Sequence, residues 1–586
     1  MGGIGLVLNV AKDALLTQQY AIDVTSHNIA NVGTDGYSRQ TAVIEAKDAA
    51  PYGGFIFGRG VELNDIIRNT NEFIEKRMQS GQSDLSSVTE QCTYMNVLET
   101  IFDESSGSSL SSQFDEFWAS FNDLANNPSG IPERNILVEN AVLLSESFNN
   151  LYTDVRKMND EINNSIETGI DDVNEILTKI ADINMQIVAI ETSGNANDLR
   201  DQRNSLVTEL SQYLEVNTYE YDDGNLVVTT GKGYTLVSRG DTYPLTLEGG
   251  GIILESSPSA RIDITDSIES GKIGGWLDMR DNIIPEVIAN LNELAGALIW
   301  EVNSIHSQGI GLEGISSLTG TYSVSDPGAA LGTEASGLDY YDKIADGAFT
   351  LWLYDADGNA VGSADITVDA DVMTMSDLAT EINDLVIGLD DAFNASASDD
   401  RLNIEIDGAY SGYTFAFSND TSNILAALGV NTFFQGSDSR GIAVNDSVIN
   451  DKNNIAAARI DADGEFAEGD NTNALAITEL QYSDVTIRQW TYGDEGAASE
   501  DITNNTLDEY LHMLVSSIGI KSQSLQRTKE YKETIQTELT TARDNISAVS
   551  LDEEMTNLIK FQQAYTAAAK LITTADEMLD TLLAVR

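Results

Sequence analysis

Hydrophobic residues near the start of the chain recur at heptad spacing. Four aliphatic side chains repeat every seven residues beside small alanines, and this pattern predicts an amphipathic helix with a narrow apolar stripe. The stripe consists of Leu8, Leu15, Ile22 and Ile29. Asn31 and Gly33 then follow as helix-stop residues. Little else in this part of the sequence could cover the stripe and remove it from water.

The end of the chain carries a matching pattern. No Gly or Pro interrupts residues 521–586, and apolar side chains there follow a spacing of three or four residues. This stripe contains Leu551, Met555, Leu558, Tyr565, Ile572, Leu579 and Leu582. A terminal helix with an apolar seam needs a partner, and the simplest one is the other terminal helix, in the same chain or in a neighbouring subunit. An ordinary coiled coil within one chain would use the same residues.

Long helices are also predicted between the two ends. After Pro132, residues 131–192 contain only Gly169 as a breaker. Isoleucine, leucine and valine recur every three or four residues from Ile162 to Ile190, and a single helix of this length would measure about 90 Å. Further helices are predicted at about 66–103, 109–125, 197–213, 283–307 and 504–547. Such helices favour a rod-like bundle over a compact enzyme core.

Two internal stretches change to strand and turn patterns. Residues 221–281 predict β-hairpins, and residues 321–440 contain strand candidates at 349–354, 364–368 and 413–417. The predicted fold class is therefore α+β and multidomain. Its parts are a terminal helical coiled coil (1–60 with 548–586), a long-helix domain with β-hairpins (61–314 with 450–547) and an inserted β-rich outer domain (315–449).

Composition narrows the possible partners. The 586 residues carry a formal net charge of −62, and 41% of them are apolar. Such acidity excludes binding to nucleic acid or to an anionic membrane through the general field of the protein. The apolar content matches folded domains, so the charge does not indicate disorder. Residues 321–440 hold 21 acidic residues and three basic ones, and we expect this acidity to keep an exposed surface hydrated.

The sequence shows no targeting or membrane signal. No run of 18 apolar residues occurs, so we expect no membrane insertion. The first residues, Met1-Gly-Gly-Ile-Gly-Leu, do not have the composition of a secretory signal peptide. If the protein leaves the cytoplasm, we expect a route that does not read a cleaved signal.

Candidate chemistry is sparse. Asp-Ala-Asp-Gly occurs at 355–358 and at 461–464, but the regular ligand spacing of a calcium loop is missing, and acidic hairpin tips are commoner. His27, His306 and His512 lie far apart, and Cys92 is the single cysteine. A packing role for His306 and a structural thiol at Cys92 are therefore expected. We predict no catalytic residue, no metal and no cofactor.

Motifs at both ends resemble one superfamily. The run Ser-His-Asn-Ile-Ala-Asn-Val-Gly-Thr-Asp-Gly-Tyr-Ser-Arg-Gln at 26–40 resembles the N-terminal motif of bacterial flagellar rod, hook and hook-associated proteins. Its motif residues are Asn28, Ala30, Asn31, Thr34, Gly36, Tyr37 and Arg39. The runs at 551–565 and 568–583 are similar to the matching C-terminal motif.

Internal segments are similar to the hook-associated protein 1 (FlgK) family. They are Asp198–Ser211, Asn303–Gly309, Asn431–Ser437 and Gly469–Ala476. The resemblance covers nearly the whole chain in order and is weakest at about 315–430.

This resemblance implies a structural subunit at the junction between the flagellar hook and filament. It implies a helical layer of about eleven subunits, with hook protein on one side and the next hook-associated protein or the filament on the other. It also implies export through the flagellar type III apparatus, and an export chaperone of the FlgN family bound at about 545–586. The two terminal stripes would then form the assembly seam, ordered when neighbouring subunits arrive.

Other interpretations remain open. Another axial flagellar protein, such as hook, distal rod or a flagellin-like subunit, would share the terminal motifs. A secreted adhesin has only the triplet Arg239-Gly240-Asp241 in its favour. An enzyme domain inserted at 321–440 would lack a metal or nucleophile motif.

Overall fold

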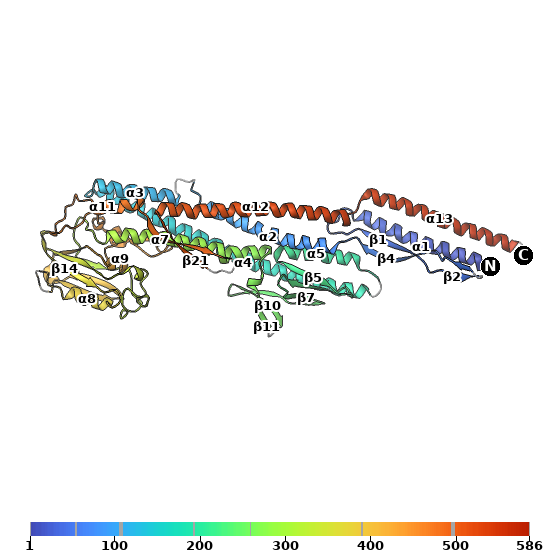
Figure 1. The fold of residues 1–586 in the computed structure, drawn as a ribbon, viewed down its shortest axis with the longest axis horizontal. Helices are drawn as coiled ribbons and strands as arrows, with labels where there is room; N and C mark the ends of the chain where they lie inside the picture. Colours follow the sequence, from blue (N-terminus) through green and yellow to red (C-terminus); the bar gives the residue numbers. More distant parts are fainter. Residues whose placement is uncertain are drawn as a thin grey trace. The chain divides into compact units, whose positions relative to one another are not determined.

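The computed structural model describes residues 2–52, 55–104, 109–191, 194–257, 260–387, 389, 391–493 and 498–584 (Figure 1). The chain forms two compact units. The first comprises Met1–Thr93, Glu161–Met279 and Gln523–Arg586, and the second comprises Tyr94–Asp160 and Arg280–Ser522. Both units contain residues of the long helices α2 (Glu72–Ile101), α4 (Ile131–Glu191) and α12 (Leu507–Ser547).

The two ends of the chain pair with each other in the first unit. Helix α1 (Gly2–Ala30) packs along α13 (Leu551–Ala584), and the helices run antiparallel, with both termini at the same end (Figure 1). The helix stop expected after residue 30 is confirmed. The next segments inward also meet, because Lys532 on α12 donates to Asp84 on α2 over 2.6 Å. Within this unit, the first helix of the chain therefore contacts the last one, and α2 contacts α12.

A β-ribbon follows α1, and the sequence patterns did not reveal it. Its strands are β1 (Gln40–Ala46), β2 (Ala50–Tyr52), β3 (Phe55–Phe57) and β4 (Val61–Arg68). Strand β1 pairs with β4, β2 pairs with β3, and β1 and β4 both pack on α1. The helix expected from about residue 66 was wrong at its start, because Ile66 and Ile67 pair with β1 and α2 begins only at Glu72.

Helix α4 is one continuous element of 61 residues, as expected. Most of the predicted apolar stripe is buried, but Ile183 is half-buried and Ile190 is 45% exposed. Asn184, which follows Ile183 in the sequence, occupies a core position instead and is fully buried. Its Nδ2 donates to the Leu226 carbonyl over 2.8 Å, so a polar side chain here joins the helix to a hairpin.

Two small antiparallel sheets in the first unit confirm the hairpins predicted at 221–281. One has the order β5-β6-β7-β8 and the other the order β11-β10-β9. The elements are α5 (Asn197–Tyr213), β5 (Val216–Glu220), β6 (Leu226–Thr230), β7 (Thr235–Ser238), β8 (Asp241–Thr242), β9 (Leu245–Glu248), β10 (Gly251–Ser257), β11 (Ala260–Asp263), η1 (Thr265–Ser267) and α6 (Gly271–Asp278). Arg239 and Gly240 form the exposed turn between β7 and β8.

The second unit has an aromatic core between helices. Helices α3 (Leu110–Asn126) and α7 (Ile284–His306) contribute to it, with a short π-helix, η2 (Met279–Ile283), directly before α7. Phe117 and Phe121 of α3 are fully buried, and the Phe121 ring lies 5.3 Å from that of Phe433. Large aromatic side chains fill this core without help from other subunits.

The β-rich insertion expected at 321–440 is present. Two three-stranded sheets, β14-β13-β17 and β12-β16-β15, form most of it. Its core contains Trp352 and Tyr354, and the Trp352 Nε1 donates to Ser418 Oγ over 2.9 Å. The elements are β12 (Ser317–Thr319), η3 (Glu334–Ser336), η4 (Tyr341–Lys343), β13 (Gly347–Tyr354), β14 (Ala360–Val368), α8 (Met375–Asn383), β15 (Phe393–Ser398), β16 (Arg401–Ile406), η5 (Gly408–Tyr410) and β17 (Thr414–Ser418).

Short elements lead from the insertion back to α12. They are α9 (Ile424–Ala427), β18 (Phe434–Gln435), β19 (Ala443–Val444), α10 (Asp446–Asn450), η6 (Lys452–Asn454), α11 (Thr472–Glu479), η7 (Leu480–Tyr482), β20 (Val485–Tyr492) and β21 (Ala498–Asn505). The predicted fold class, α+β with paired terminal helices, long helices and a β-rich insertion, is confirmed.

One helical stretch, Gly271–His306, is long and apolar enough to cross a membrane by length and composition. Of its most apolar window, 56% is buried inside the structure, as in the core helix of a folded domain.

Candidate assembly site at the junction of the terminal motifs

The last turn of α1 carries an asparagine whose hydrogen-bonding groups are all used. Asn28 is 1% exposed. Its Nδ2 donates to the Gln40 carbonyl over 2.8 Å and to Glu554 Oε2 over 3.2 Å. Its Oδ1 accepts from the Gln40 amide at 2.9 Å and from the Tyr37 hydroxyl at 2.7 Å. One side chain thus joins the end of α1, the start of β1 and the first turn of α13.

Arg39 forms the second link between the two terminal motifs. Its Nη2 lies 2.7 Å from Glu554 Oε1, and its Nη1 lies 2.8 Å from Glu553 Oε2. Its backbone amide donates to the Ser547 carbonyl over 2.9 Å, at the last residue of α12. Glu554 is 2% exposed, and a buried carboxylate needs a partner charge to offset its desolvation. These contacts fix the break between α12 and α13 onto the strand that follows α1.

Helix α5 joins the same network through its first turns. Asp201 accepts from the Ser38 amide at 2.9 Å and pairs with Arg68 Nη1 at 2.8 Å. Asp198 Oδ1 accepts from the Gln40 side-chain amide at 2.8 Å. The segment Asp198–Ser211, singled out for its family resemblance, therefore lies directly against the N-terminal motif.

Tyr37 and Gly36 form the turn that makes this approach possible. Gly36 has φ 78°, and a Cβ there would lie 2.3 Å from Ser205 Oγ on α5. Both the left-handed conformation and the close approach favour glycine. Burial, and then the charges of Asp198, Asp201 and Glu554, raise the pKa of the Tyr37 hydroxyl, so it stays a neutral donor to Asn28.

The remaining motif residues are more peripheral. Asn31 Nδ2 donates to the His27 carbonyl over 3.0 Å and closes the end of α1. Thr34 is exposed, and its hydroxyl donates to Asn31 Oδ1 over 3.2 Å. Ala30 is exposed at the last position of the helix. We refer to Asn28, Tyr37, Arg39, Gln40, Asp198, Asp201, Glu553 and Glu554 together as the motif junction.

Small residues line the most buried positions between α1 and α13. Ala11 and Ala21 of α1 are at most 1% exposed, and Ala568 and Ala575 of α13 are at most 5% exposed. Thr25 is also buried, and its hydroxyl donates to the Ala21 carbonyl within the same helix. Because alanine has no side chain beyond Cβ, these positions let neighbouring backbones approach closely.

The residues predicted to form the seam are less buried than these alanines. Half-buried positions are Leu8, Leu15, Ile22, Ile29, Leu558, Ile572 and Leu579. Leu551 and Met555 are each 48% exposed, and Tyr565 is 40% exposed. Leu582 belongs to α13, but its side chain lies outside the described residues. A single chain therefore covers this apolar set only in part.

Sequence reasoning did not single out several residues of the junction and of the contact between the helices. Glu553 and Glu554 stood inside the quoted C-terminal run, and Asp198 and Asp201 inside the α5 segment, but none was assigned a contact. Charged residues inside a motif at a predicted helix start were the available signal. The alanine run ending at Ala569 could also have indicated the closest approach of the two helices.

Other candidate residues lie outside this junction. His306 is fully buried at the end of α7, where its Nδ1 lies 2.8 Å from the Asn431 carbonyl and its Nε2 accepts from the Ala456 amide at 3.0 Å. These bonds confirm a packing role. Cys92 is 5% exposed on α2, and its burial raises the pKa of its thiol. Both properties are those of a structural cysteine.

The acidic Asp-Ala-Asp-Gly segments are tips of turns. Asp355 Oδ1 accepts from the Asp357 and Asn359 amides, and Asp461 Oδ1 accepts from the Asp463 and Glu465 amides. These carboxylates thus stabilise their own loops. Within the ranges that the structure describes, no group of three or more His, Cys, Asp or Glu side chains could hold a metal ion.

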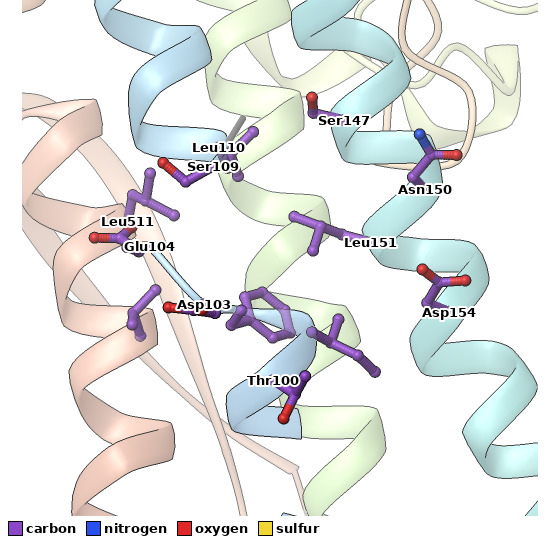
Figure 2. Close-up of a pocket in the computed structure, with 13 residues that line it drawn as sticks. Thr100, Asp103, Glu104, Ser109, Leu110, Ser147, Asn150, Leu151, Asp154 and Leu511 are labelled. Carbon is purple, nitrogen blue, oxygen red and sulfur yellow. The ribbon is translucent and has the colours of Figure 1, made fainter. Parts of the chain in front are cut away.

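The second unit contains a cavity of about 340 Å³ (Figure 2). Asp103 and Glu104 approach it from the segment after α2, Asp154 from α4, and Leu511 from α12 (Figure 2). Its described lining residues are aliphatic, aromatic, hydroxyl, amide or acidic, and include no His, Cys, Lys or Arg. This lining does not provide a nucleophile with a basic partner.

Three sequence families match the chain, each at a different position. The flagella basal body rod protein family matches residues 8–37, and the flagellar basal body rod FlgEFG protein C-terminal family matches residues 543–585. The family described as the flagellar hook-associated protein FlgK helical domain matches residues 95–320. The two end matches cover most of α1 and all of α13, which identifies the chain as a structural protein of the bacterial flagellar axis.

Full-length relatives identify the family within this class. The chain is 26% identical to flagellar hook-associated protein 1 of Escherichia coli (strain K12) over 607 residues, which covers 99% of this chain and 100% of the relative. The same protein of Bacillus subtilis (strain 168) is 26% identical over 585 residues, covering 98% and 97%. Along its whole length the chain is similar to the flagellar hook-associated protein 1 (FlgK) family, and it is a structural component of the flagellum.

A solved structure supports the fold. The flagellar hook junction protein FlgK from Burkholderia pseudomallei matches with a TM-score of 0.51 and 15% sequence identity, covering 81% of this chain and 100% of that one.

Proposed function

We propose that this chain is a structural subunit of the junction between the flagellar hook and filament, and an adaptor on which the filament assembles. One observation carries the proposal. Three sequence segments that resemble the family meet in the motif junction, at the base of a helix pair that leaves its larger apolar side chains partly exposed. The motif junction holds the base of the α1–α13 pair in place, and the exposed side chains are available to contact neighbouring subunits.

The terminal pair can provide the assembly contacts. Partly exposed aliphatic side chains along α1 and α13 gain free energy when a neighbour removes them from water, at about 25 cal/mol for each Å² covered. Leu551, Met555 and Ile559 are each about half exposed along one stripe of α13. Contacts between unlike surfaces of successive subunits generate an open helical assembly. A layer of about eleven subunits, bounded by hook protein on one side and by the next hook-associated protein or filament on the other, fits this scheme.

Export and chaperone binding follow from the same helices. A chain that orders its ends fully only on assembly stays narrow during export and avoids premature polymerisation. Export without a cleaved signal, through the flagellar type III apparatus, is therefore part of the proposal. A chaperone of the FlgN family would cover α13, within about 545–586, before assembly. The role is architectural rather than enzymatic.

Each of the three domains predicted from the sequence has its own role in this proposal. Residues 1–60 and 548–586 would form the assembly domain, and residues 61–314 with 450–547 the long-helix domain. The insertion at 315–449 would face solvent, where its acidic residues keep the outer surface hydrated.

Removal of residues 551–586 tests the proposal. We expect a folded, soluble core that does not assemble, because α13 supplies half of the terminal pair and the Glu554 contact to Arg39. The full-length chain is the matched control. Binding of hooks by the truncated chain, measured by co-sedimentation, would contradict the proposed role of the terminal pair.

A second test concerns the cellular role. Electron microscopy of flagella from cells without this chain should show intact hooks that carry no filament, with filament subunits released into the medium. Normal filaments on those hooks would rule out an adaptor role.

A further inference from the structure

The tip of the β-ribbon exposes large apolar side chains. Phe55 is 71% exposed, Ile56 is 79% exposed and Phe57 is 42% exposed. In register, Ile56 pairs with Pro51, and Phe57 pairs with Ala50. Because side chains alternate along a strand, Phe55 and Phe57 share one face, with rings 6.4 Å apart, and Ile56 lies on the other. Both faces of the tip are therefore apolar.

The ribbon places its tip at the end of its own helix. Near the base of the tip, the Cβ position at Gly60 lies 3.2 Å from Val10 Cγ1 on α1. From Gly60 to Ile56 a strand advances about 13 Å, which is about the length of helix that precedes Val10. Figure 1 accordingly shows β2 beside the N-terminus. The tip of the ribbon therefore lies level with the first turns of α1.

The tip is also uncharged. Residues 49–58 contain no charged side chain, in a protein with 22% charged residues and a net charge of −62. Two copies of so acidic a chain repel each other through most of their surface. An uncharged apolar tip can approach another copy without this cost, which favours a second copy as its occupant.

A second copy offers a matching surface. Leu571 and Met578 lie seven residues apart on one face of α13 and are 49% and 54% exposed. Antiparallel pairing brings this part of α13 to the level of the first turns of α1, near the level of the ribbon tip (Figure 1). Helix α1 contacts both α13 and the ribbon strands β1 and β4, and it lies between them (Figure 1).

We propose that Phe55, Ile56 and Phe57 of one subunit pack against Leu571 and Met578 on α13 of a second copy. The contact joins unlike surfaces at a similar level, so it repeats from subunit to subunit around the assembly. This inference rests on the proposed function, because it names a lateral partner for the same terminal helices. It assigns the ribbon a role that the predicted seam did not include.

Photocrosslinking in assembled flagella tests the contact. A benzophenone amino acid replaces Ile56 in the full-length chain, and the control carries it at Glu45, an exposed position nearer the base of the ribbon. We expect a crosslink between two copies from position 56, mapped by mass spectrometry to residues 564–584, and little from position 45. Crosslinks from position 56 only to another protein, or only within one chain, would overturn the proposal.

A pair of substitutions provides the quantitative test. In F55S/I56S the tip becomes polar, and in the control I502S an equally exposed isoleucine of β21 is removed. We expect the amount of F55S/I56S in purified hook–filament junctions to fall about tenfold. The reason is that the contact between subunits loses part of the burial of two large apolar side chains. The control should remain at the wild-type level, and circular dichroism should show unchanged helix content in both variants.

The two proposals fail in different ways. If the wild-type chain is recovered at the junction and F55S/I56S is recovered equally, the ribbon contact is wrong and the junction role stands. If the wild-type chain itself is absent from the junction, the proposed function is wrong, and the ribbon contact fails with it.

Discussion

The aromatic core of the second unit and the terminal helix pair of the first are packed in different ways. In the core, Phe114, Phe117 and Phe121 of α3 are completely buried. In the terminal pair, the most buried apolar positions are alanines, and larger side chains such as Leu8 and Ile572 are only half-buried. One region is complete within a single chain, and the other has apolar surface left to cover.

This difference explains why a structural subunit of the flagellum carries both. A complete core keeps the exported chain soluble and folded once it arrives, and an incomplete pair supplies free energy for assembly. Apolar burial in the core should therefore affect the stability of the free chain. Apolar burial at the sides of α1 and α13 should mainly affect association.

The largest effect is expected in the aromatic core. F117A removes a fully buried ring that contacts Phe121 and Phe434, and should lower the free energy of unfolding by about 3–5 kcal/mol. Denaturant unfolding of the purified full-length chain measures this loss. A loss below about 1 kcal/mol would show that the core is not closely packed.

Acid should weaken the second unit through His306. Burial, and then the nearby charge of Arg134, lower the pKa of His306 to about 4, and the neutral ring accepts from the Ala456 amide. Between pH 4 and the ordinary value near 6.5 the unfolded chain binds the proton and the folded chain does not. The stability from the neutral ring is therefore present above pH 6.5 and is lost as the pH falls towards 4, by about 3 kcal/mol in total.

The matched variant for the acid effect is H306Q. Its unfolding free energy should change less between pH 6.5 and 4.5 than that of the wild-type chain, because a glutamine does not titrate. Equal pH slopes for the two chains would show that His306 is not the titrating group.

Next in size is the charge pair of the motif junction. R39A leaves the Glu554 carboxylate buried without its cation and should cost about 2 kcal/mol, less than for a fully buried pair because Arg39 is 21% exposed. Amide hydrogen exchange should report the loss at the start of α13. R543A, which removes an exposed neighbour pair with Asp544, is the control and should cost little. Equal effects of R39A and R543A would mean that the junction does not hold the helices.

The smallest effect on the free chain is expected at the sides of the terminal pair. I572A should lower the unfolding free energy of the monomer by less than about 1 kcal/mol, because the side chain is only half-buried. The same change should reduce incorporation into hook–filament junctions clearly. A large loss in the monomer without a loss of incorporation would reverse the contrast between the two regions.

Periodicity in the sequence was sufficient for the long elements. The heptad stripes of α1 and α13 predicted their pairing, and the run from Ile162 to Ile190 predicted the second half of α4. Periodicity could not show which residues of each stripe would be most buried, because both alanines and leucines follow the same period. In the structure Ala21 and Ala575 are buried, whereas Leu15 and Leu579 are only half-buried.

Polar interactions were the part that sequence patterns missed. Asn184 occupies a core position because it binds a hairpin backbone, and a hydrophobic pattern carries no sign of this. The motif junction joins residues more than 500 positions apart, such as Asn28 and Glu554. Motif resemblance indicated that both segments matter. Their contact depends on the antiparallel pairing of α1 with α13, which sets the register.

Amide hydrogen exchange of α13 in the free and assembled chain tests the central claim most directly. Amides in residues 554–580 should exchange much faster in the free monomer than those of α7, and should become strongly protected in isolated hook–filament junctions. The amides of α7 serve as the internal control and should change little. Equal protection of α13 in the two states would contradict the claim that neighbouring subunits complete the terminal pair.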